Sequence, residues 1–133
     1  MWRRAHDRFR RAVDRYHQVI EPVPEGPARD RLELAGGRLA ACLDEVRGRA
    51  AAAQGRWPST GLQVPGGDGA DAHHRLSRAA TLAAQAAEGA TMVRVAARNS
   101  SAGADGGALV EPRCASVERA VALVERELSG PPA

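Results

Sequence analysis

The stretch from Asp71 to Arg98 constrains the fold more than any other part of the chain, because it predicts one long helix built largely of alanine. Alanine has the highest helix propensity, and apolar residues recur here at alternating spacings of four and three. Such a face buries little area alone, so it needs a partner helix that comes close or brings large side chains. The residues of this face are Ala72, Leu76, Ala79, Ala83, Ala86, Ala90, Val93 and Ala97.

The opposite face of the same predicted helix is polar. A polar stripe opposite an apolar one is typical of a solvated surface, and we favour that interpretation over a polar binding site. Asp71 is suited to cap the first turn, because its carboxylate can accept hydrogen bonds from free backbone N–H groups. The polar stripe consists of His74, Arg78, Thr81, Gln85 and Glu88.

Another helix is predicted over residues 2–20. Trp2, Phe9 and Tyr16 are spaced by seven, so they line up on one face. They are three of the four aromatic residues in the chain. Helices interdigitate when large and small residues alternate across their contact, so this stripe is the natural complement of the alanine face. We therefore predict that the aromatic stripe lies in the core.

Arginines occupy the other side of helix 2–20. This helix carries six arginines and two aspartates, a charge of +4, so the rest of the chain carries −1 of the total of +3. Asp7 and Arg11, like Arg10 and Asp14, are spaced to pair along the helix. We favour a solvated face, and the alternative is an anion-binding face for nucleic acid, acidic lipid or an acidic partner. The candidate residues are Arg4, Arg8, Arg11 and Arg15.

Two more helices are predicted over residues 27–54 and 112–128, each beginning with a proline, which suits the first helical position. The intervening loops are 55–70 and 99–111. Loop 55–70 is longer than most helix–helix connections, and its apolar residues are a candidate plug for one end of the bundle: Trp57, Leu62 and Val64. Its glycine-rich part lacks the Lys-Ser/Thr pair of a phosphate-binding P-loop.

These elements predict an all-α fold, a single domain over 1–133 arranged as an antiparallel, up-down-up-down four-helix bundle with a long loop between the second and third helices. A loop of this length also allows a different connection order. Alanine supplies much of the apolar content, so the core is thin for the chain length. A thin core favours association, either as a homodimer or with another helical protein.

Chemical sites find little support in the sequence. His6 and His17 lie about 16 Å apart along one helix, too far to share an ion, and no metal-binding spacing accompanies His73 and His74. Cys42 and Cys114 fall on predicted core seams, where thiols are usually inert. We therefore expect no metal, no cofactor and no enzymatic activity.

The remaining features concern location and function class. The basic N-terminus is not followed by an apolar signal sequence, and no run is apolar enough to span a bilayer, so we expect a cytoplasmic protein. Every basic residue is arginine, which is typical of high-GC bacterial coding. The favoured function is a non-enzymatic protein–protein interaction or scaffold module. The alternatives are an anion-binding module and small-ligand binding between helices or under the Trp57 loop; nucleic acid is not favoured as a partner.

Overall fold

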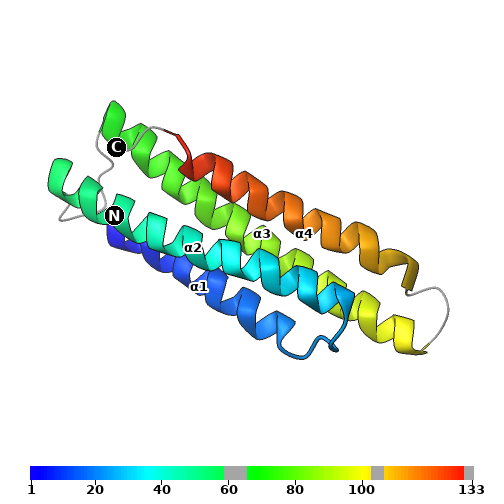
Figure 1. Cartoon of the computed structure of the whole chain (residues 1–133). Coiled ribbons are helices and arrows are strands. Elements are labelled where there is room, and N and C mark those ends of the chain that lie inside the picture. Colours follow the sequence, from blue (N-terminus) through cyan, green and yellow to red (C-terminus); the bar gives the residue numbers. More distant parts are fainter. Residues whose placement is uncertain (59–65, 103–106, 131–133) are drawn as a thin grey trace.

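The computed structural model describes residues 1–58, 66–102 and 107–130, and within them the chain forms four long helices packed side by side (Figure 1). The predicted all-α four-helix architecture is confirmed. The helices are α1 (Trp2–Ile20), α2 (Pro27–Arg56), α3 (Asp68–Ala102) and α4 (Gly107–Leu128). No helix in these three ranges is both long enough and apolar enough to span a membrane.

The two predicted loops, 55–70 and 99–111, prove too long. α2 continues to Arg56, where the backbone N–H of Trp57 still donates to the carbonyl oxygen of Ala53. α3 begins at Asp68 and ends at Ala102, so it exceeds the predicted 71–98 at both ends. α4 begins at Gly107, and Pro112 lies inside it instead of starting it. Pro112 is the sixth residue of α4, beyond the four N–H groups that have no intrahelical partner, so it removes the hydrogen bond that a backbone N–H at this position would donate to the carbonyl oxygen of Ala108.

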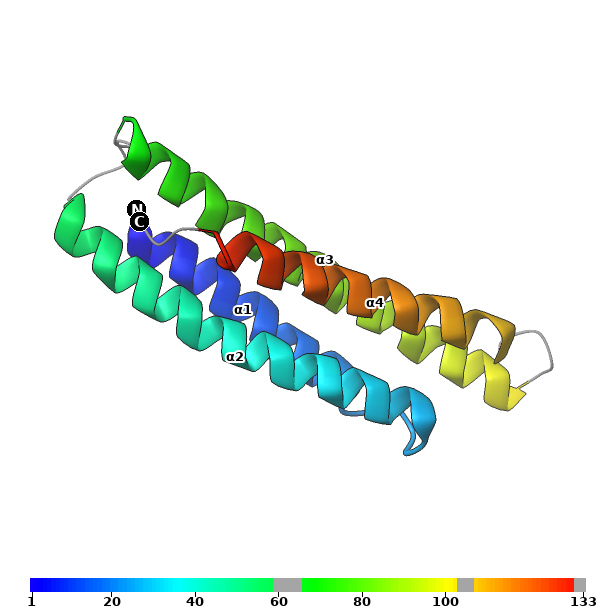
Figure 2. The same ribbon diagram turned by 45° about the horizontal axis from the view of Figure 1, so that its top comes forward.

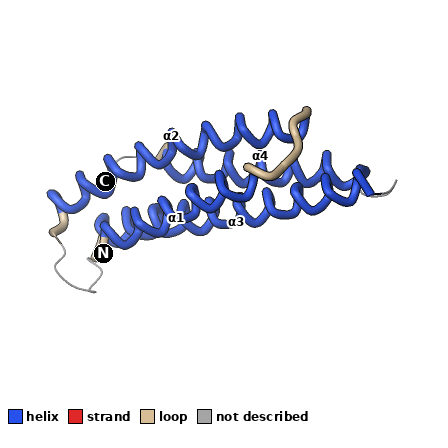
Figure 3. The backbone as a smooth tube through the Cα atoms, turned by 90° about the horizontal axis from the view of Figure 1, so that it is seen from below, coloured by secondary structure: helices blue, strands red, loops and turns tan. Residues whose placement is uncertain are grey.

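The four helices do not follow one another around the bundle in the order of the chain. Consecutive helices run in opposite directions (Figure 1), but α2 packs mainly against α1 and α4, and α3 against α1 and α4. Figure 3 shows α2 and α4 on one side of the bundle and α1 and α3 on the other. The helices α2 and α3 therefore occupy diagonal positions, and the parallel pairs α1–α3 and α2–α4 are neighbours.

The aromatic stripe of α1 and the alanine face of α3 are both buried in one core, and the two helices pack against each other. Trp2, Phe9 and Tyr16 are all at most 1% exposed. Five alanines of α3 are completely buried in the same core: Ala79, Ala83, Ala86, Ala87 and Ala90. The alanine face is thus buried within the chain, and this removes one reason to require a second copy.

Two glycines mark the closest helix contacts. A Cβ atom on Gly36 of α2 would lie 3.0 Å from ring atoms of Tyr16 and His17 of α1. A Cβ atom on Gly89 of α3 would lie 2.9 Å from a methyl group of Val117 of α4. Both helix pairs therefore approach more closely than alanine would permit without movement. Beyond the turn between α1 and α2, α3 and α4 continue as a pair (Figures 1 and 2).

The contact between α2 and α4 carries a ladder of ion pairs, which was not among the contacts predicted from the sequence. Arg31 binds Glu118 through two hydrogen bonds, of 3.1 and 2.5 Å. Arg38 binds Glu125 through two hydrogen bonds in the same way, about two helical turns further along. Both partners advance by seven residues, which is possible because the two helices are parallel. Arg31 also contacts Glu111, which extends the acidic series on α4 by a further seven residues.

Candidate functional site

The predicted arginine face is a continuous exposed stripe on α1, formed by Arg4, Arg8, Arg11 and Arg15. The core residues of α1 hold it outward, because Phe9 and Tyr16 fix the opposite side of the helix in the bundle. The stripe lies beside α3, since the Nη2 atom of Arg8 donates to Thr81 Oγ1 over 3.4 Å. The structure therefore places these four residues together, as the sequence predicts.

No carboxylate among the described side chains lies within ion-pair distance of the arginine face. Asp7 instead contacts His6 Nδ1, at 3.1 Å, and the pairs that the spacing allows, Asp7–Arg11 and Arg10–Asp14, are not formed. The arginines of α2 behave differently. Five of them pair with carboxylates: Arg29, Arg31, Arg38, Arg47 and Arg49.

The neighbouring edge of α3 does little to neutralise this charge. Between residues 72 and 99 the sequence holds one acidic residue, Glu88. It lies seven residues beyond Thr81, on the same side of α3, and it is exposed. Glu88 and the exposed Asp14 of α1, neither of which forms an ion pair with a described residue, offset only part of the charge of four arginines, which leaves a net positive stripe along α1 and α3.

The predicted plug at the end of the bundle is represented by Trp57 alone, because Leu62 and Val64 lie outside the described residues. The Nε1 atom of Trp2 donates to the carbonyl oxygen of Trp57 at 2.9 Å, and the two indole rings are 6.1 Å apart. The guanidinium of Arg56 lies 4.8 Å from the centre of the Trp57 ring, in position for a cation–π contact. Trp57 is therefore held at the end of α2 by groups on both sides.

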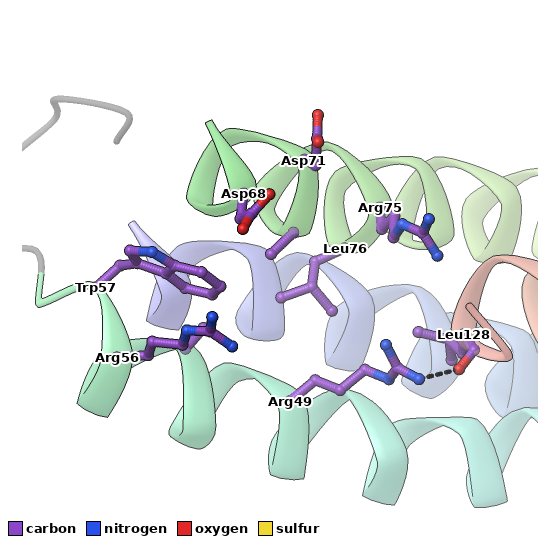
Figure 4. A pocket seen from close by; sticks show the side chains of 10 residues that line it. Arg49, Arg56, Trp57, Asp68, Asp71, Arg75, Leu76 and Leu128 are labelled. Carbon is purple, nitrogen blue, oxygen red and sulfur yellow. Dashed lines mark hydrogen bonds between the residues drawn. The ribbon is translucent and has the colours of Figure 1, made fainter. Parts of the chain in front are cut away.

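A cavity of about 310 Å³ opens next to Trp57, between the end of α2, the start of α3 and the end of α4 (Figure 4). Its inner wall is apolar, because Leu76 and Leu128 are buried there beside Ala53. Charged groups surround this wall: Arg49, Arg56, Asp68, Asp71 and Arg75. In Figure 4 Asp68 points toward the cavity and Asp71 points away from it.

The arginines of this cavity differ in how they are engaged. Arg49 is committed to the protein, because it pairs with Glu45 and donates to the carbonyl oxygens of Leu128 and Gly130 at the end of α4. Neither Arg56 nor Arg75 forms an ion pair with a described carboxylate, although Asp68 and Asp71 line the same cavity. Two guanidinium groups at this end of the bundle therefore keep unused hydrogen-bond donors.

The described part of the chain contains no cluster of metal ligands and no pair of neighbouring thiols. No group of three or more His, Cys, Asp or Glu side chains gathers there to hold an ion. Cys42 and Cys114 are both buried and free. The ion pairs set α2 and α4 in register so that Cys42 lies level with residue 129. Cys114 is 15 residues away from that level, and a helix rises about 1.5 Å per residue, so the two thiols are roughly 22 Å apart. They cannot form a disulfide with one another.

Comparison with protein-family models, curated proteins and solved structures finds no match to this chain. The class of the protein is therefore taken from its fold alone, which is an all-α four-helix bundle. The ladder could have been found from the sequence, since acidic residues recur every seven positions in α4. The cavity could not, because it joins three helices whose arrangement depends on the connection order.

Proposed function

We propose that this protein is a non-enzymatic protein–protein interaction module, and that its arginine face binds an acidic protein partner. The observation that carries this proposal is the contrast between paired and unpaired arginines. Like charges at a spacing of four residues destabilise a helix by a few tenths of a kcal/mol each, about as much as opposite charges gain. The pairs Arg4–Arg8 and Arg11–Arg15 have this like-charge repulsion in the free protein, and an acidic partner would relieve it on binding.

The geometry of the stripe favours a protein over a nucleic acid or a membrane. From Arg4 to Arg15 the stripe extends about 16 Å along α1, which matches three turns of an acidic helix. Guanidinium groups form two-point hydrogen bonds with carboxylates, as Arg31 and Arg38 already do within this chain. Stacking with bases would require aromatic side chains among the arginines, and those of α1 are buried in the core.

Membrane insertion would require exposed apolar side chains beside the arginines. The large apolar residues exposed in the described part of the chain lie on α2, α3 and α4 instead: Leu34, Met92, Val95, Leu109 and Leu123. An acidic lipid surface is therefore a weaker candidate than an acidic protein.

The experiment compares poly-L-glutamate, a DNA duplex and phosphatidylserine vesicles as probes at low and high salt. We expect the protein to bind poly-L-glutamate in a salt-dependent manner, and we expect replacement of Arg4, Arg8, Arg11 and Arg15 by glutamine to abolish binding. A matched control removes the same charge from exposed positions elsewhere, at Arg47, Arg98, Arg119 and Arg126. Equal loss in both variants would show an effect of net charge alone, and tighter binding to DNA or vesicles would favour those alternatives.

Self-association remains a separate prediction. A homodimer could not use the arginine face symmetrically, since like charges would meet, so it would rest on the exposed apolar residues of α2, α3 and α4. Light scattering coupled to size exclusion tests this at low and high salt. A dimer that persists in high salt would support self-association, and a monomer would leave the acidic partner as the proposal. The cytoplasmic location likewise stays a prediction.

A further inference from the structure

The cavity beside Trp57, at one end of the bundle, is lined in part by apolar side chains. The indole of Trp57 forms one side, and Leu76 and Leu128 form the inner wall at 2% and 5% exposure (Figure 4). A volume of about 310 Å³ lies at the lower end of the range for small-molecule pockets, about 300–1,000 Å³. The cavity is therefore sized for a compact ligand with one or two rings.

The charged groups around the cavity indicate which charge such a ligand would carry. Asp68 lies in the first turn of α3, where the helix dipole favours a negative charge, so the helix itself stabilises this carboxylate. Arg56 lies in the last turn of α2, where the helix dipole favours a positive charge, and it contacts the Trp57 ring. Arg75 has neither support and forms no ion pair with a described carboxylate. The charge that is left without a partner at the cavity is thus the positive charge of Arg75, and guanidinium groups bind carboxylates and phosphates through two parallel hydrogen bonds.

Gly130 leaves open the space that the Arg75 guanidinium occupies at the edge of the cavity. The Nη1 atom of Arg75 lies 1.3 Å from the point where a Cβ atom of Gly130 would stand, so the guanidinium occupies space that any other residue would fill. In Figure 4 the side chain of Arg75 extends from α3 toward Leu128. Gly130 therefore permits the position of Arg75 and offers a way to disturb it without changing the charge.

We propose that this cavity binds a small aromatic monocarboxylate, with the ring packed between Trp57 and Leu76 and the carboxylate bound by Arg75 and Arg56. Asp68 disfavours more highly charged anions, because a second negative charge would lie close to its carboxylate. Inorganic phosphate and nucleotides are therefore poor ligands. The proposal does not depend on the arginine face, which lies on α1 and the other edge of α3.

Calorimetric titration with 2-naphthoate tests the proposal, with 2-naphthamide as the neutral analogue of the same shape. We expect 2-naphthoate to bind and Arg75→Gln to weaken it about tenfold or more, the loss typical of a hydrogen bond between charged groups. Gly130→Ala should also weaken binding, since it displaces the Arg75 guanidinium. Arg78→Gln is the matched control, because Arg78 pairs with Glu127 and does not line the cavity.

The position of the ligand is checked by the NMR shifts of the Trp57 indole N–H and the Leu128 methyl groups, with the methyl groups of Val117 as a reference inside the bundle. Shifts confined to the cavity support the proposal. Failure of 2-naphthoate to bind at millimolar concentration would overturn it. Equal affinity for 2-naphthamide, or for the Arg75→Gln variant with its fold retained, would remove the role of the carboxylate.

Discussion

The hydroxyl group of Tyr16 donates a hydrogen bond of 2.7 Å to the backbone carbonyl oxygen of Leu32, inside the contact between α1 and α2. Burial, with smaller contributions from Cys114 and Glu118, raises the pKa of Tyr16, so the phenol stays protonated and remains a donor. This bond fixes the lengthwise position of α1 against α2, because it joins the last turns of one helix to the first turns of the other.

Replacing Tyr16 with phenylalanine removes this bond and keeps the buried ring. The Leu32 carbonyl oxygen retains its own helical hydrogen bond, so we expect a modest loss of about 1 kcal/mol in the free energy of unfolding. Urea denaturation followed by circular dichroism measures it. An unchanged midpoint would show that the hydroxyl group contributes nothing to stability.

Alanine substitutions at Gly36 and Gly37 should act in opposite directions. Alanine favours a helix over glycine by about 1 kcal/mol, so Gly37→Ala, where no atom lies within 4 Å of a new Cβ, should stabilise the protein. At Gly36 the new Cβ would meet the rings of Tyr16 and His17 at 3.0 Å, and we expect a net loss. Thermal unfolding of the two variants decides the matter; a gain at Gly36 equal to that at Gly37 would contradict the close contact.

The ladder between α2 and α4 makes stability depend on acid pH. Hydrogen bonds from Arg31 and Arg38 lower the pKa values of Glu118 and Glu125 below their ordinary values. A carboxyl group whose pKa is lower in the folded state stabilises the protein above its unfolded-state pKa, and this contribution disappears as the pH falls through the folded-state value. Both glutamates are partly exposed, so each pair should contribute less than about 1 kcal/mol.

Unfolding free energies measured from neutral to acid pH test this dependence. We expect the double variant Glu118→Gln, Glu125→Gln to be less stable than the original protein at neutral pH and to lose less stability on acidification. Glu25→Gln serves as the control, because Glu25 is exposed and forms no ion pair with a described residue. Identical pH profiles for the double variant and the original protein would contradict a stabilising ladder.

The two thiols should be unreactive in the folded protein. Burial raises the pKa of Cys42 to about 11 and also raises the pKa of Cys114, so little thiolate is present at neutral pH. Reaction with an aromatic disulfide reagent should be slow for the native protein and complete after unfolding in guanidinium. Rapid labelling of either thiol under native conditions would show that the helix seams open readily.

The sequence by itself determined the four helices and the buried face of each one. Helix propensity and the spacing of apolar residues act within one segment, so the aromatic stripe and the alanine face could be located before any packing was known. The stripe of Arg4, Arg8, Arg11 and Arg15 follows from the same periodicity. Helix ends were less well determined, because the alanine and glycine residues around Pro112 are compatible with either loop or helix.

Only the tertiary structure decided which helices are neighbours. The diagonal placement of α2 and α3 brings α2 beside α4 in parallel, and this creates the pairing of Arg31 with Glu118 and separates Cys42 from Cys114. It also brings Trp57, Arg75 and Leu128 around one cavity. These contacts depend on distances between segments far apart in the chain, which local spacing does not encode, whereas the faces that make them are set by each helix alone.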